Sequence, residues 1–164
     1  MDEIVWAVNP KHDTLESLAS YLEKFAIDFL GLAGIRCRLD LPLETPGWQL
    51  SSEARHHLFL AYKEALNNIA KHSGASEARI RLTLAAATFE LEMADNGCGF
   101  VPPEHGRTRD QQGGHLGGNG LTTMQRRLQD IGGVCDIKSI PGQGTRVTFY
   151  VALKPAAGSS GKRI

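Results

Sequence analysis

Three stretches of the chain repeat apolar residues at the spacing of an amphipathic helix. They run from Asp13 or Thr14 to about Leu32, from Ser51 or Ser52 to His72, and from Leu121 to Ile131. An aspartate, threonine or serine caps the start of a helix, and glycine close behind the last apolar residue ends one. The pattern therefore predicts three helices that each turn one apolar face toward a shared core.

Other stretches alternate apolar and polar residues and so predict strands. They cover residues 36–41, a hairpin of 78–85 with 88–94, and a pair of 134–140 with 145–153 around a Pro-Gly turn. Helices that stand apart from mostly hairpin-connected strands favour separate layers. We expect an α/β (α+β) two-layer sandwich in which about three helices cover one face of a mixed β-sheet.

Residues 100–120 hold two prolines and many glycines but almost no apolar periodicity. A structureless connection of this length inside a compact domain is usually functional or disordered. We therefore predict a flexible lid here. Arg107 and Arg109 in this segment are candidates for contact with phosphates, although solvated loop arginines are the commoner case.

Composition limits the kind of protein. The chain has 164 residues, of which 41% are hydrophobic, enough for one core but too few for two ordinary domains. Acidic and basic residues balance at 18 each, so we expect no nucleic acid partner, and no basic amphipathic run points to membrane contact. The three cysteines are widely spaced without a CxxC pair, which argues against zinc and disulfides and favours a cytoplasmic setting.

The second expected helix carries a cluster of polar residues. Glu64 and Asn68 are four positions apart and so share a face, and Lys71 and His72 follow at the helix end. A carboxamide oxygen is a hard, neutral ligand that suits Mg²⁺, which takes much of its shell from water and substrate phosphates. The alternative is that these residues form the solvated side of an amphipathic helix.

A second cluster follows the strand at 88–94. Asp95 can accept a hydrogen bond from an amino group, while Gly97 and Gly99 allow a flat ring such as adenine to approach closely. The same Asp-Asn-Gly sequence is also a strong turn signal that needs no ligand.

A third cluster, residues 117–121, stands just before the last expected helix. Flexible backbone amides and a helix N-terminus meet there, an arrangement that receives phosphates elsewhere, although a plain hinge is the alternative. The glycines fit neither GxGxxG nor GxxxxGK[ST], which disfavours Rossmann and P-loop nucleotide sites.

Taken in order, these blocks resemble the GHKL ATPase superfamily, which has the Bergerat ATP-binding fold with a flexible ATP lid, and most closely histidine kinases of the nitrate-sensor type. Residues 64–72 resemble the N box, 95–99 the G1 box, 118–121 the G2 box, and 142–145 the closing glycine motif. The likeness covers roughly residues 51–153.

The resemblance implies ATP and Mg²⁺ as cofactors. It assigns Asn68 to the metal, Asp95 to the adenine amino group, Thr145 to the adenine edge, and Glu64 to orienting or activating the phosphoacceptor. Glu64, Asn68 and Lys71 would form the catalytic set. The remaining nucleotide-binding residues that it implies are Lys71, His72, Gly97, Gly99, Gly118, Gly120 and Leu121.

The resemblance also implies a division of the chain. Residues 1–12 would be a remaining linker from the dimerisation region, 13–154 the ATP-binding catalytic domain, and 155–164 a disordered tail. No histidine stands in a phosphoacceptor block, so we expect the γ-phosphoryl to reach a histidine on a separate dimerisation and phosphoacceptor domain. The implied partners are those helices of the parent kinase and a downstream response regulator. The resemblance leaves open whether the parent kinase is anchored in a membrane.

Two other functions are open. One is an anti-sigma-factor-like serine kinase. The opening residues 2–10 argue against it, because they resemble the joint that follows the dimerisation helices of histidine kinases. The other is a nucleotide-gated interaction module without transfer, in which ATP changes the exposed surface. The combination of Glu64, Asn68 and Lys71 favours chemistry over this second alternative.

Overall fold

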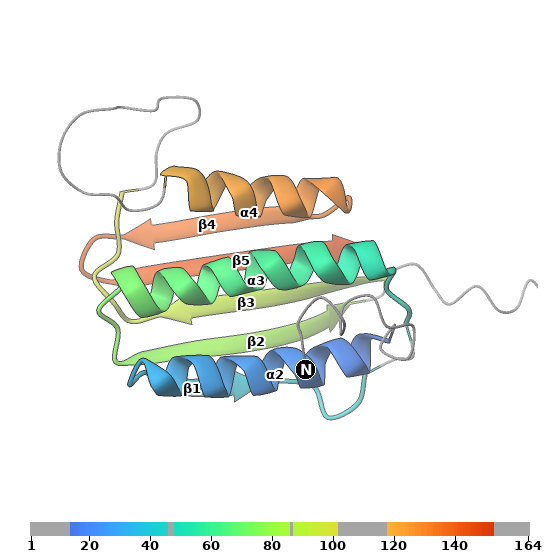
Figure 1. The fold of residues 1–164 in the computed structure, drawn as a ribbon, viewed down its shortest axis with the longest axis horizontal. Helices are drawn as coiled ribbons and strands as arrows, with labels where there is room; N and C mark the ends of the chain where they lie inside the picture. The colour runs from blue at the N-terminus through green and yellow to red at the C-terminus, as the bar shows by residue number, and fades with distance from the viewer. Residues whose placement is uncertain (1–13, 46–47, 86, 102–117, 153–164) are drawn as a thin grey trace, which may run out of the picture.

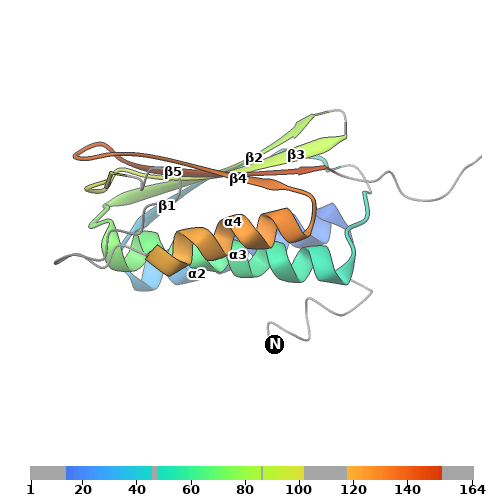
Figure 2. The same cartoon turned by 90° about the horizontal axis from the view of Figure 1, so that it is seen from above.

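The computed structural model describes residues 14–45, 48–85, 87–101 and 118–152, and this part of the chain forms two layers. Figures 1 and 2 show a five-stranded sheet with a layer of helices on one of its faces. The helices are α2 (Leu15–Leu32), α3 (Ser52–His72) and α4 (Gly118–Asp130). The strands are β1 (Arg36–Asp40), β2 (Glu77–Ala85), β3 (Thr88–Asp95), β4 (Val134–Ile140) and β5 (Gly144–Ala152). The predicted fold class is confirmed.

The sheet is mixed and has the order β1-β2-β3-β5-β4. β1 runs parallel to β2, whereas the other neighbouring strands are antiparallel. Both hairpins expected from the sequence are present. β3 is the central strand, with β2 on one side and β5 on the other, and Asp95 is its last residue.

The first two helices begin at hydroxyl caps that the sequence predicts. Thr14 Oγ1 accepts a hydrogen bond from the Ser17 N–H at 3.2 Å, and Ser51 Oγ accepts one from the Ala54 N–H at 3.1 Å. Each cap satisfies one of the N–H groups that the first turn of a helix leaves without a helical partner.

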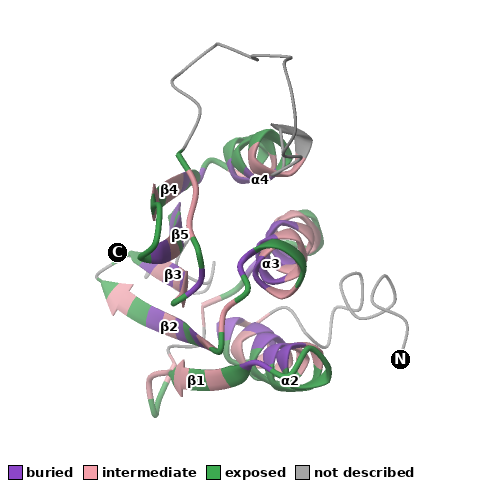
Figure 3. Cartoon of the chain, turned by 90° about the vertical axis from the view of Figure 1, so that its left-hand side faces the viewer, coloured by how far each residue is buried: buried purple, intermediate pink, exposed green. Residues whose placement is uncertain are grey.

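The core lies between the two layers, and Figure 3 shows buried residues on the helix faces that turn toward the sheet. Phe25 and Phe59 join α2 to α3 by an edge-to-face contact with ring centroids 5.2 Å apart. The sheet contributes the alternate positions of its strands, including Ile80, Leu91 and Phe149, which are almost fully buried. This apolar layer fixes where the end of α3 stands over the centre of the sheet.

The start of α4 differs from the expectation. The helix begins at Gly118, so Gly118 and Gly120 belong to its first turn and not to a loop that ends before Leu121. Glycine has low helix propensity, which made the sequence point to a later start. Packing of α4 against α3 supplies the stabilisation that propensity lacks.

Several expectations concern residues outside the described part of the chain. These are the linker at 1–12, most of the lid with Arg107 and Arg109, and the tail at 155–164. Among the helices of the described residues, none combines the length and apolar character needed to cross a membrane.

Candidate functional site

An open pocket lies between the end of α3, the start of α4 and the strands β3 and β5. Every block singled out in the sequence contributes to its wall. The lining residues are Ala65, Asn68, Ile69, His72, Ser73, Met93, Asp95, Cys98, Gly99, Phe100, Leu121, Thr145 and Val147.

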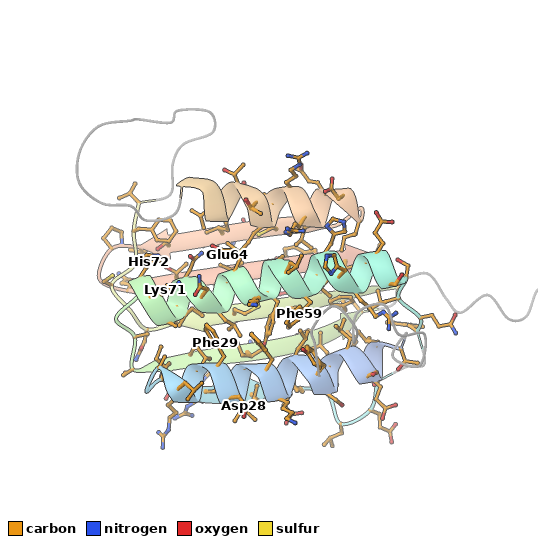
Figure 4. The ribbon with its side chains drawn as sticks, viewed as in Figure 1. Asp28, Phe29, Phe59, Glu64, Lys71 and His72 are labelled. Carbon is orange, nitrogen blue, oxygen red and sulfur yellow. The ribbon has the colours of Figure 1, made fainter. Side chains whose placement is uncertain are left out.

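Asn68 and His72 come from one face of α3. Successive helical residues are about 100° apart, so Ala65, Asn68 and His72 share a face with Ile69 beside them. Glu64 and Lys71 lie further around the helix, beyond Asn68 and away from Ile69, and neither lines the pocket. Figure 4 shows Glu64, Lys71 and His72 toward the same end of α3, and Lys71 is exposed.

The carboxylate of Asp95 is held by backbone groups. The Gly97 N–H donates to Asp95 Oδ1 at 2.8 Å, and the Thr145 N–H donates to the same carboxylate. Burial raises the pKa of Asp95 above its ordinary value, and these two hydrogen bonds lower it in part. A half-buried, fixed acceptor therefore stands at the end of β3.

Gly97 allows the loop after β3 to pack on the C-terminal end of α3. A Cβ at Gly97 would overlap the carbonyl oxygen of Ser73 and would lie 2.8 Å from Asp95 Oδ1. The Cys98 N–H donates to that same Ser73 carbonyl at 2.7 Å. Gly97 is buried and does not line the pocket, so its role at the adenine ring stays a prediction.

The turn between β4 and β5 closes the other side of this loop. Gly99 has φ +63°, and a Cβ there would overlap the Ile140 carbonyl oxygen. The Gly142 N–H donates to the Cys98 carbonyl at 2.6 Å. Gly144, with φ +99°, similarly leaves no room for a Cβ beside the Asp95 carbonyl. The closing glycine motif thus supports the end of β3, where Asp95 stands, and the loop that follows it.

Sequence reasoning missed several residues of the site. Met93 and Val147 form part of the pocket wall, but alternation along a strand marks only a buried position. Ser73 stands directly after the predicted end of the second helix, yet its hydroxyl donates to the Ile69 carbonyl at 2.5 Å and its carbonyl accepts the Cys98 N–H. No sequence pattern distinguishes such a serine from an ordinary helix end.

The arrangement suits a flat, polar-edged base with phosphates. Apolar side chains of Ala65, Ile69 and Met93 offer contact to a ring, and Asp95 with Thr145 offers hydrogen bonds to its edge. Among the described residues no group of three His, Cys, Asp or Glu side chains could hold a metal. Asn68 is a neutral oxygen donor in this wall that could hold Mg²⁺ if phosphates and water completed the shell.

Comparison with known proteins points the same way. Residues 53–155 match the family model described as histidine kinase-, DNA gyrase B- and HSP90-like ATPase. Sensor histidine kinase LiaS of Bacillus subtilis is 31% identical over 117 residues, 71% of this chain and 30% of that protein. Sensor histidine kinase YhcY of the same organism is 28% identical over 160 residues, 98% of this chain and 38% of that protein. The chain thus matches about a third of the length of these relatives.

A solved structure has the same fold. The histidine kinase domain from the Erythrobacter litoralis EL346 blue-light activated histidine kinase superposes with a TM-score of 0.65 at 16% identity. The match covers 92% of this chain and 69% of that one. At this identity the likeness concerns the fold alone.

Proposed function

The chain belongs to the family of histidine kinase-, DNA gyrase B- and HSP90-like ATPases, and on that premise we propose that it transfers the γ-phosphoryl of ATP to a histidine of a sensor kinase. The chain would supply the ATP-binding catalytic domain, and the histidine would lie on a separate dimerisation and phosphoacceptor domain. Its sensor histidine kinase relatives support this assignment over a serine kinase or a nucleotide-gated interaction module.

The fixed carboxylate of Asp95 is the observation that carries the proposal. It lines an open pocket beside apolar side chains, and two backbone N–H groups orient it without filling all of its acceptor positions. The exocyclic amino group of adenine is a donor that such a carboxylate accepts. Asp95 would therefore select the base, as the motif resemblance implies.

Asn68 and His72 would contact the phosphates, an assignment supported by their position in the pocket wall on the same face of α3 as Ala65. Mg²⁺, when bound, would neutralise charge on the phosphates, with Asn68 as its protein ligand. In-line phosphoryl transfer depends mainly on positioning and electrostatic stabilisation. Glu64, beside the start of α4, would orient or activate the acceptor imidazole.

The finer assignments rest on the motif order. We also propose that the chain belongs to the nitrate-sensor-type subfamily and that a response regulator is its downstream partner. The phosphoacceptor histidine would lie on the parent kinase's own helices. Contacts of Lys71, Gly118 and Gly120 with phosphates belong to the same proposal, as does a cytoplasmic location.

Calorimetric titration of the purified chain with ATP, ADP and GTP, with and without Mg²⁺, tests the base site. We expect selective binding of the adenine nucleotides, and its loss in Asp95→Ala. Equal binding of ATP and GTP would contradict the role of Asp95. Absence of nucleotide binding by the folded wild-type chain would overturn the proposed function.

A further inference from the structure

The hydroxyl group of Ser139 joins two segments of the pocket wall. Ser139 lies in β4 directly opposite Thr145 of β5. Ser139 Oγ is 2.8 Å from Thr145 Oγ1, it accepts the Phe100 N–H at 2.8 Å, and it is 3.3 Å from the Gly144 carbonyl oxygen. Both Phe100 and Thr145 line the pocket, whereas Ser139 stands behind them.

The Ser139 proton has two possible acceptors, Thr145 Oγ1 and the Gly144 carbonyl oxygen. A serine hydroxyl has one proton and two acceptor positions, and one acceptor position is taken by the Phe100 N–H. Hydrogen bonds between hydroxyl and carbonyl or hydroxyl oxygens are usually about 2.5–3.0 Å long. The Thr145 contact falls within this range and the Gly144 contact falls outside it. Either hydroxyl can be the donor in the Thr145 contact: with Thr145 as donor, the Ser139 proton goes to the Gly144 carbonyl oxygen, and with Ser139 as donor, Thr145 keeps its own proton.

The direction of the hydrogen bond between Ser139 and Thr145 decides what Thr145 offers to a ligand. When Thr145 Oγ1 accepts the Ser139 proton, its own proton is free to point into the pocket. Adenine presents an amino donor beside a ring nitrogen acceptor, N1. Asp95 is suited to the amino group, and a Thr145 hydroxyl that keeps its proton is suited to N1, directly or through one water.

From this geometry we infer that Ser139 is a positioning residue for base recognition: it orients the Thr145 hydroxyl as a donor toward the adenine edge. The inference rests on the proposed function, because it concerns the same pocket. It adds a residue that does not touch the nucleotide and that no motif singles out.

A matched pair of variants isolates the hydroxyl. Ser139→Thr keeps the hydroxyl, and Ser139→Val replaces that hydroxyl with a methyl group in a side chain of the same shape as threonine. The probes are ATP and 1-deaza-ATP, in which carbon replaces N1. We expect Ser139→Thr to stay within about twofold of wild type, and Ser139→Val to lose about tenfold in ATP affinity. Affinity for 1-deaza-ATP should be the same in all three proteins.

Two further measurements separate positioning from a structural role. In a Thr145→Val background, Ser139→Val should cause no additional loss of ATP affinity. Thr83→Val, an exposed position of β2 away from the pocket, is the control for replacing a strand hydroxyl and should change neither affinity. Melting temperatures establish that each variant is folded.

The result that overturns the inference is an equal loss for ATP and 1-deaza-ATP in Ser139→Val, since a merely structural effect does not depend on N1. Unchanged ATP affinity in folded Ser139→Val overturns it as well. Failure of the wild-type chain to bind ATP would instead remove the proposed function on which the inference stands.

Discussion

The carboxylate of Glu64 in α3 lies against Gly120 in the first turn of α4, where a Cβ would overlap Glu64 Oε1. The N-terminus of a helix attracts negative charge through its free N–H groups and its dipole. Glu64 thus stands at a place that is also favourable for phosphates, and its position depends on the missing side chain at Gly120.

Gly120→Ala should displace the Glu64 carboxylate without unfolding the domain. The obstructing atom is the end of a flexible side chain, and alanine has the higher helix propensity, so we expect stability to change by less than about 1 kcal/mol. A misplaced catalytic group commonly costs on the order of 10²-fold in rate. Phosphoryl transfer in a parent kinase that carries this domain should fall markedly, and Glu64→Gln should lower it in the same way. Normal transfer in folded Gly120→Ala would show that this contact is unimportant.

Gly97→Ala should destabilise the domain, because the new methyl group would overlap the backbone of Ser73 and crowd Asp95. Overpacking of this kind costs about 1–3 kcal/mol. Gly31→Ala is the matched control, since a Cβ at this position in α2 meets nothing within 4 Å. It should be neutral or stabilising by up to about 1 kcal/mol. Urea denaturation of both variants checks the difference, and equal stability of the two would contradict the packing argument.

Asn68→Ala should lower phosphoryl transfer more than nucleotide affinity, because the proposed metal ligand acts mainly on productive placement of the phosphates. We expect a loss of about 10²-fold in transfer, the scale typical of one preorganised electrostatic group. Asn67→Ala removes the same carboxamide from the neighbouring position, which does not line the pocket, and should leave both quantities near wild type. Single-turnover transfer measured across Mg²⁺ concentrations tests this, and equal losses in the two variants would refute the assignment.

The raised pKa of Asp95 predicts a pH dependence of stability. A carboxyl group whose pKa is higher in the folded than in the unfolded state favours folding when protonated. This contribution is complete below the unfolded pKa and is lost as the pH rises through the folded pKa. Asp95→Asn cannot ionise, so it should gain stability relative to wild type on going from strongly acidic to neutral pH. Denaturation at both pH values measures the gain, and a constant difference would count against it.

Local patterns predicted most of the fold because capping residues mark where helices begin and alternation marks where strands run. Thr14 and Ser51 cap their helices as side-chain oxygens do in general, and alternation located the strands to within a residue or two. The predicted start of α4 at Leu121 was wrong because Gly118 and Gly120 have low helix propensity. Packing against α3 outweighs that low propensity.

The predicted site residues and the wall of the pocket overlap in part. Asn68, His72, Asp95, Gly99, Leu121 and Thr145 line the pocket as the motifs suggested. Lys71 and Glu64 lie to the other side of Asn68, a difference that follows from helix geometry once the direction of the pocket is known. The roles of Ser73 and Ser139 depend on contacts between distant segments, which no local pattern contains.

The pocket is assembled from α3, β3, α4 and β5, so its walls meet only when contacts far apart along the chain have formed. A ligand of such a pocket binds the folded chain and not the unfolded one. Ligand at about 100 times its Kd then adds roughly 2.7 kcal/mol to the free energy of unfolding. Under the proposed function, the supply of ATP in the cell would therefore also govern how much of the domain stays folded and how well it resists proteolysis.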